Sequence, residues 1–317
     1  MQNENNTPFK VAVVQAAPVF LDRAATIEKA CALIATAGRE GARLIIFPEA
    51  FIPTYPVWVW TIPSGEQEVL GELYAQLVAN AVTIPSEATN VLCRAAKLSG
   101  AYVVMGMSER NVEASGGSLY NTLLYIDPQG QILGKHRKLV PTAGERLVWA
   151  QGDGSTLQVF DTPLGKLGGL ICWENYMPLA RYSLYAAGTQ IYVAATWDRG
   201  NPWLSTLRHI GKEGGVYVLG CSIAMRKDDI PDHFAFKQKF YANTEEWLNF
   251  GDSAIVNPEG FFIAGPVRHK EEILYADIDP CQMRAPKWML DVAGHYARPD
   301  VFELIVHTNP QRMIRKE

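Results

Sequence analysis

The chain has 317 residues, of which 48% are hydrophobic and 20% are charged, and its formal net charge at pH 7 is −4. This balance is typical of a globular protein with a large core and argues against a disordered chain. The acidic net charge, without a long run of Lys and Arg, disfavours binding to nucleic acid or another polyanion.

In the first half of the chain, short apolar runs alternate with amphipathic helical patterns. We predict strands at 11–15, 44–47 and 102–106, and helices at about 24–39 and 86–99. The rhythm then changes to a β-hairpin, with strands at 123–126 and 132–134 on either side of the turn Asp127-Pro128-Gln129-Gly130.

The second half repeats this order. Strands are predicted at 167–171, 190–194 and 216–220, and helices at 177–187 and about 203–213. A second hairpin joins 254–256 to 261–263 through the turn Asn257-Pro258-Glu259-Gly260. We therefore expect an α/β protein with pseudo-duplicated halves and mixed sheets, forming one domain over 1–285. Residues 286–317 form a tail, too short to fold alone, with apolar side chains such as Trp288, Tyr296 and Phe302.

The chain start and the cysteines bear on the compartment. The sequence does not begin with a basic segment followed by an apolar run, and no apolar stretch reaches the roughly 18 residues that cross a bilayer. Five cysteines, at positions 31, 93, 172, 221 and 281, lack a C-x-x-C pair or a His at metal-ligand spacing. This scattered set disfavours a disulfide framework or structural zinc. We expect a cytoplasmic protein with reduced thiols, no metal and no cofactor.

Reactive side chains follow several of the predicted strands. Glu49 comes after an apolar run, Lys138 after the first hairpin, and Cys172 after Gly169-Leu170-Ile171, while Glu145 lies in the loop 141–146. Polar residues that end buried strands tend to meet at one sheet edge. A thiol beside a cation or base can have its pKa lowered from about 8.5 and act as a nucleophile. A carboxylate can move its proton, and an ammonium or a backbone N–H can stabilise the charge that develops.

Each of these residues also has a structural interpretation. A lone Cys at the end of a buried strand is usually a small core residue, and single Glu and Lys residues are usually surface charges. A Cys-His pair of the papain type would use His136, but we expect a packing or orienting role for this residue. An apolar substrate pocket could be lined by Tyr55, Trp58, Trp60, Trp173 and Trp197, although core packing explains each of them equally well. We assign Tyr55, Trp173 and Trp197 as candidate substrate-binding residues.

Three strings resemble the landmark motifs of the nitrilase (carbon–nitrogen hydrolase) superfamily, in the family's order between about residues 10 and 280. They are Phe47-Pro48-Glu49, His136-Arg137-Lys138-Leu139 and Cys172-Trp173-Glu174-Asn175. Further strings resemble the nitrilase branch itself: Pro141-Thr142 with Glu145-Arg146-Leu147-Val148-Trp149, the extension of the cysteine motif to Arg181, and Gly294-His295-Tyr296-Ala297-Arg298-Pro299-Asp300-Val301. Amidase and carbamoylase branches generally lack the last string.

The resemblance implies a four-layer αββα sandwich and a triad of Glu49, Lys138 and Cys172, with Glu145 as an auxiliary residue. It also implies hydrolysis of an organic nitrile to the carboxylic acid and ammonia, through a thioimidate and a thioester on Cys172. Dimers and longer spiral assemblies, partly built through the tail, are implied as well. One departure is Gly144, where many nitrilases carry a bulkier or acidic residue, which affects the loop shape and substrate preference.

Three alternatives stay open at this point. The same residues would serve an amidase or carbamoylase that starts from a planar amide, and a cyanide-hydrating enzyme would stop at the amide. A non-catalytic assembly protein of this fold is the third, and the intact set of Glu49, Lys138 and Cys172 argues against it.

Overall fold

Two mixed β-sheets form the centre of the computed structural model, which describes residues 7–311. The first sheet has the order β13-β1-β2-β3-β4-β5. Its strands are β1 (Phe9–Gln15), β2 (Ala42–Ile46), β3 (Tyr102–Arg110), β4 (Leu119–Ile126), β5 (Ile132–Arg137) and β13 (Glu272–Ile278). The second sheet has the order β10-β11-β9-β8-β7-β6, with β12 paired to β11. Its strands are β6 (Phe160–Thr162), β7 (Gly165–Ile171), β8 (Ile191–Thr196), β9 (Tyr217–Ser222), β10 (Ala224–Arg226), β11 (Trp247–Val256) and β12 (Phe262–Arg268).

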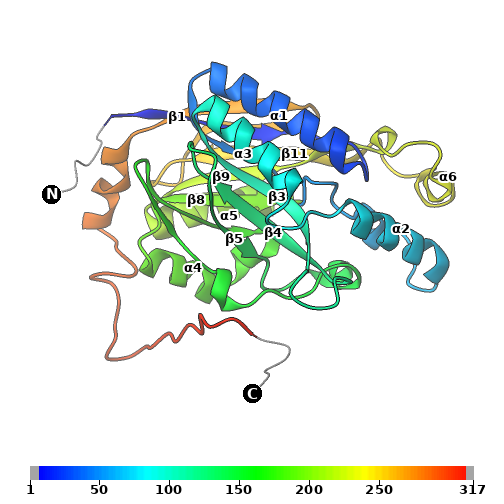
Figure 1. Ribbon diagram of the computed structural model, residues 1–317. Helices are drawn as coiled ribbons and strands as arrows, with labels where there is room; N and C mark the ends of the chain where they lie inside the picture. The colour runs from blue at the N-terminus through cyan, green and yellow to red at the C-terminus, as the bar shows by residue number, and fades with distance from the viewer. Residues whose placement is uncertain (1–6, 312–317) are drawn as a thin grey trace.

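Helices cover the outer face of each sheet. The α-helices are α1 (Arg23–Arg39), α2 (Gln67–Asn80), α3 (Glu87–Ser99), α4 (Pro178–Ala186), α5 (Asn201–Gly214) and α6 (Ala235–Tyr241). Short 3-10 helices are η1 (Val57–Trp60), η2 (Ala143–Leu147), η3 (Gly154–Thr156), η4 (Cys172–Tyr176), η5 (Lys227–Asp229), η6 (Pro280–Met283) and η7 (Ala285–Trp288). Helices α1 and α3 lie side by side on the first sheet, while α4 and α5 pack on the second (Figure 1). The four-layer αββα sandwich is confirmed.

Side chains alternate in direction along the strands, and this divides the core of the sandwich into three layers: one between the sheets and one under the helices on each side. In β1, Val11 and Val13 point into the cluster between the two sheets, whereas Ala12 and Val14 point toward α1 and α3. Successive side chains of a strand face opposite sides, so a strand buried on both faces reads as a continuous apolar run. Helix α1 meets this face with Ile27, Ala30, Ile34 and Ala37, one stripe at helical spacing. Burying a side chain such as that of Ile34 stabilises the fold by roughly 1.5–3 kcal/mol.

The two halves of the chain share one strand topology. In the first half, β1, β2 and β3 are parallel neighbours, and β4 and β5 continue as an antiparallel hairpin. In the second half, β7, β8 and β9 are parallel, and β11 and β12 continue in the same way. The predicted pseudo-duplication is therefore confirmed at the level of strand order and direction.

Besides the 3-10 helices and the short strands β6 and β10, three of the described elements were not predicted. Strand β13 pairs antiparallel with β1, from Phe9 opposite Ile278 to Gln15 opposite Glu272, so the end of the second half completes the sheet of the first. Helix α2 buries only Leu73 and Leu77, too narrow a stripe to mark a helix by periodicity. The third, α6, is a helix of 7 residues within a long connection.

The last part of the chain leaves the sandwich. Residues 289–311 contain no helix or strand, and Figure 1 draws them as an extended segment. The backbone N–H of Gln311 donates to Asp153 Oδ2 at 2.7 Å, which ties the end of this segment to the loop before η3. The division into a domain over 1–285 and a tail over 286–317 stays a prediction, and residues 312–317 lie outside the described part. Among residues 7–311, no helix is both long enough and apolar enough to span a bilayer.

Candidate active site

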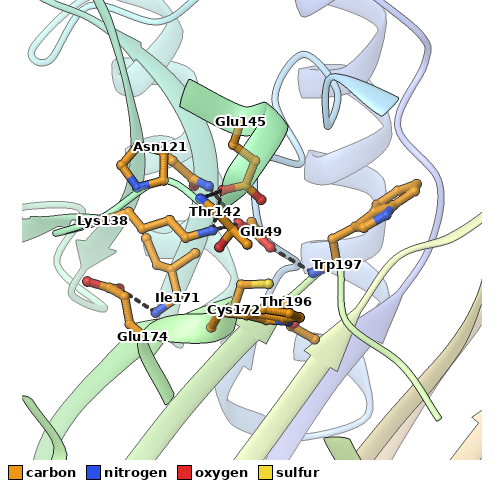
Figure 2. Close-up of polar contacts among 12 residues, drawn as sticks. Glu49, Asn121, Lys138, Thr142, Glu145, Ile171, Cys172, Glu174, Thr196 and Trp197 are labelled. Atoms are coloured by element: carbon orange, nitrogen blue, oxygen red, sulfur yellow. Dashed lines mark hydrogen bonds and ion pairs between the residues drawn. The ribbon is translucent and has the colours of Figure 1, made fainter. Parts of the chain in front are cut away.

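Four side chains from both sheets converge at one end of the sandwich (Figure 2). Glu49 follows β2, Lys138 is the first residue after β5, Cys172 is the first after β7, and Glu145 lies in η2. The reactive atoms of Glu49, Glu145 and Cys172 all lie within 4.8 Å of one another, and all three side chains are buried. The structure therefore brings together the four residues that the sequence nominated, each from a different segment.

The Lys138 ammonium lies between the two carboxylates. Its Nζ donates to Glu49 Oε1 at 2.8 Å and to Glu145 Oε2 at 2.7 Å, and the side chain is fully buried. Burial alone would lower the pKa of Lys138, but the neighbouring Glu49, Cys172 and Glu145 outweigh it and raise the pKa, so the lysine stays charged. Two carboxylates and a thiol could also hold a metal ion, but here the ammonium already takes the position of the cation.

Besides Lys138, two further donors hold Glu49 in place. Asn121 Nδ2 donates to its Oε1 and the Trp197 backbone N–H to its Oε2, both at 2.7 Å. Burial raises the pKa of Glu49 to about 7, against the opposing effect of Lys138. A carboxyl that titrates near neutral pH is suited to accept and return a proton. The segment carrying it runs beside β3 and approaches it closely at Gly106, where a Cβ atom would lie 1.9 Å from the Pro48 carbonyl oxygen.

Cys172 opens η4 with a φ of 53°, in the left-handed region that a residue with a side chain rarely adopts. Burial and the Glu49 charge raise the pKa of the Cys172 thiol well above its ordinary value, and Lys138 and a hydrogen bond with the Thr196 side chain only partly oppose this. The nearby cation does lower the pKa of this thiol, as expected, but burial outweighs its effect in the resting site. The thiol is protonated at neutral pH and must lose its proton to a base as it reacts.

Glu145 is fixed by its own set of donors. The Tyr55 hydroxyl donates to Oε1 at 2.7 Å, and the Thr142 backbone N–H donates to Oε2 at 2.8 Å. Trp60 Nε1 donates to the Tyr55 hydroxyl at 2.9 Å, and the Tyr55 ring stacks on Trp197 with centroids 4.3 Å apart. With both oxygens occupied by donors, Glu145 is held in one orientation in front of Cys172.

A cavity of about 440 Å³ opens onto the thiol. Its wall includes all three candidate substrate-binding residues, Tyr55, Trp173 and Trp197, together with Trp60. Trp58, by contrast, is 1% exposed and packs in the core. A larger groove of about 710 Å³ lies between α1 and α3, but none of the four converging residues lines it. The binding role of the cavity residues remains a prediction.

Several contributors were not found from the sequence. Asn121, which orients Glu49, is a polar residue inside a fully buried strand, and that position was the available signal. The Trp197 backbone N–H and the Thr196 hydroxyl carry no signal in the sequence, because their contribution depends on where β8 ends. His136 bonds to Glu174 and Thr156 and does not line the thiol cavity.

Comparison with known proteins decides the family. The model of the family described as carbon-nitrogen hydrolase matches residues 10–287. The chain belongs to the carbon–nitrogen hydrolase family. This hydrolase is 42% identical to an aliphatic nitrilase of Sinorhizobium fredii, over 97% of this chain and 98% of that protein. It is 41% identical to a bifunctional nitrilase/nitrile hydratase, NIT4B, of Nicotiana tabacum, over 96% of this chain and 88% of that protein. Such similarity over nearly the full length places the hydrolase in the nitrilase branch.

The fold of the hydrolase matches solved structures of the superfamily. The crystal structure of Saccharomyces cerevisiae Nit3, a member of branch 10 of the nitrilase superfamily, superposes with a TM-score of 0.71 at 21% sequence identity. The match covers 91% of this chain and 96% of that one. At this identity the comparison bears on the fold alone, and it supports the αββα assignment.

Proposed function

We propose that this hydrolase converts an organic nitrile to the carboxylic acid and ammonia, with Cys172 as the covalent nucleophile. The observation that carries the proposal is the buried Cys172 thiol within 4.8 Å of the Glu49 and Glu145 carboxylates, facing a cavity with aromatic walls. Nitrilases about 40% identical over nearly the whole chain support a nitrile as the substrate.

In the first step, Cys172 Sγ attacks the nitrile carbon while Glu49 accepts the thiol proton. A C–S bond forms, and one π pair of the C≡N bond moves to nitrogen. The Lys138 ammonium and the backbone N–H of Trp173 stabilise the negative charge that develops on nitrogen. Glu49 then returns its proton to that nitrogen, which leaves a neutral thioimidate on Cys172.

In the next steps, two water molecules are consumed. The first adds to the thioimidate carbon, and Glu49 passes one of its protons to nitrogen, which leaves a hydroxyl and an amino group on that carbon. The hydroxyl then gives up its proton, which Glu49 passes to the same nitrogen, so that the C–N bond breaks, ammonia leaves and a thioester with a new C=O bond remains. The second water adds to the thioester carbon, and the C–S bond breaks to release the carboxylic acid and the thiol. Glu145, held by Tyr55 and Thr142, is placed to orient the substrate or the water. Overall, one nitrile and two water molecules are converted to one carboxylic acid and one ammonia.

Self-association is proposed through the tail. Up to residue 311, where the described part ends, several of its large apolar side chains are in solvent, with Trp288 79%, Phe302 77% and Ile305 69% exposed. Apolar side chains gathered in this way commonly mark a protein–protein contact. Docking of the tail on a neighbouring subunit, in dimers or longer spiral assemblies, would bury them. A cytoplasmic location is proposed as well, because a reducing compartment keeps the Cys172 thiol free.

The test is an ammonia-release screen over aliphatic, aromatic and arylacetonitrile substrates, each with its matching amide, for the wild type and Cys172→Ala. We expect wild-type turnover of at least one nitrile class and none by Cys172→Ala. Because a bifunctional relative carries nitrile hydratase in its name, the amide product is measured alongside the acid. Turnover of amides alone would overturn the proposal in favour of an amidase.

A further inference from the structure

Glu174, two residues after Cys172, joins the two segments that carry Lys138 and Cys172. Its Oε1 accepts from the Leu139 backbone N–H at 2.6 Å, and its Oε2 accepts from the Ile171 backbone N–H at 2.8 Å. Leu139 directly follows Lys138, and Ile171 directly precedes Cys172. One buried carboxylate thus contacts the backbone next to both residues, and Figure 2 shows it on the far side of Ile171 from Glu49.

His136 supplies the matching charge. Its Nε2 lies 3.0 Å from Glu174 Oε2, and its Nδ1 lies 3.1 Å from the Thr156 carbonyl oxygen. Both partners only accept, so both ring nitrogens must carry a hydrogen, which makes the ring an imidazolium. Burial would lower the pKa of His136, but the Glu174 charge and hydrogen bond outweigh it and raise the pKa. His136 and Glu174 therefore form a buried ion pair, and the backbone N–H groups of Leu139 and Ile171 donate to the same carboxylate.

This link matters because Lys138 and Cys172 belong to different sheets. Lys138 follows β5, the edge strand of the first sheet, whereas Cys172 follows β7 in the second, and among residues 7–311 no strand pairing connects the two sheets. The other backbone bonds of Lys138, from its N–H to the Asn121 carbonyl and from the Gly152 N–H to its own carbonyl, do not reach the Cys172 segment. Glu174 contributes direct polar contacts across the sheets at this point.

We propose that Glu174, with His136 as its counter-ion, is a positioning residue that sets the placement of the Lys138 ammonium relative to the Cys172 thiol. The inference rests on the proposed function, in which Lys138 and the Trp173 N–H must meet the same substrate nitrogen. A shift of about 1 Å between such groups can lower the rate about 10²-fold. Substrate binding, which depends on the cavity wall, is affected much less.

The experiment replaces Glu174 by glutamine, which has the same shape. The amide nitrogen of Glu174→Gln cannot accept a backbone N–H bond, and the His136 charge loses its partner. We expect kcat for a nitrile to fall about 10²-fold while KM changes by less than about threefold. Carbamidomethylation of Cys172 by iodoacetamide, measured on the peptide that contains it, should slow as well, because a displaced ammonium stabilises the thiolate less.

A matched control is Glu109→Gln. Glu109 is also a buried carboxylate bonded to β5, through the side chains of Lys135 and Arg137, but it makes no bond to the Cys172 segment. Both variants should melt at a lower temperature than the wild type, and only Glu174→Gln should lose kcat and thiol reactivity. If Glu174→Gln does not fold, His136→Gln replaces it, with the same selective loss of kcat expected.

The inference is overturned if folded Glu174→Gln keeps wild-type kcat and alkylation rate, or if Glu109→Gln loses both to the same extent. In the replacement arm, a folded His136→Gln with wild-type kcat and alkylation rate overturns it equally. The alkylation rate requires no substrate. A wild type that turns over no nitrile would therefore overturn the proposed function, while the alkylation rates of the variants still decide the positioning role.

Discussion

Removing the Lys138 ammonium should damage the chemistry far more than the binding of substrate. In Lys138→Met the Glu49 and Glu145 carboxylates, whose oxygens are at most 4.8 Å apart, face each other without a cation. At an effective dielectric constant of about 20, two unit charges at 4.8 Å repel by about 3.5 kcal/mol. This energy corresponds to about a 300-fold change in the equilibrium constant for protonation of one of the two carboxylates. The two carboxyls should therefore share a proton at neutral pH, as close carboxyl pairs do.

Two losses then combine in the variant. Glu49 is less available as a base for Cys172, and the charge developing on the substrate nitrogen has lost its cation. We expect kcat to fall by about 10²-fold or more at pH 7, with little change in KM. Part of the loss should be recovered as the pH is raised, because a higher pH removes the shared proton.

The assay is ammonia release at a series of nitrile concentrations and pH values, with thermal melting to show that the variant is folded. Lys135→Met serves as the control, since Lys135 lies in β5, three residues before Lys138, but pairs with Glu109 and not with Glu49. It should keep kcat within about threefold of the wild type. Near wild-type kcat in Lys138→Met, or a loss confined to KM, would refute the reasoning.

Three further predictions concern the base, the cavity and the tail. Because the pKa of Glu49 is raised to about 7 and the base form is the deprotonated one, kcat/KM should fall as the pH drops through about 7; a flat profile down to about pH 5 would contradict this. Gly144→Ala should change the ratio of kcat/KM for bulky nitriles to kcat/KM for small ones. The new Cβ would lie 2.7 Å from the Val59 carbonyl oxygen and would displace η1, which carries part of the cavity wall. Gly65→Ala, whose Cβ would meet no atom within 4 Å, should leave this ratio unchanged. Truncation after Arg284 should give smaller particles by light scattering and lower activity with cooperative melting retained; unchanged particles with a lost melting transition would show that the tail belongs to its own core.

Most of the sandwich could be predicted because its strands are buried on both faces. Continuous apolar runs marked β1, β2, β7 and β8, and the two similar turns at 127–130 and 257–260 marked the hairpins. The pairing of β13 with β1 could not be predicted, because β13 is only partly buried and its partner lies in the other half of the chain. Pairing between halves depends on how the sheets pack, which local periodicity does not report.

The candidate site, like the fold, could be predicted from the sequence only in part. Strand ends and motif order nominated Glu49, Lys138, Cys172 and Glu145, because parallel strands finish at a common edge. The pKa of Cys172 could not be read from its neighbours in sequence, since burial outweighs the nearby lysine. Tyr55 was nominated for substrate binding, and the structure adds a hydrogen bond to Glu145 that only the folded chain reveals.

The covalent role of Cys172 is tested most directly by mass spectrometry of the wild type during turnover of a slowly hydrolysed nitrile. A thioimidate adds the whole mass of the nitrile, and we predict this gain on the peptide that contains Cys172, absent in Cys172→Ala. Alkylation confined to Cys31, Cys93, Cys221 or Cys281 should leave turnover intact. An adduct on another peptide, or robust turnover by Cys172→Ala, would contradict the account.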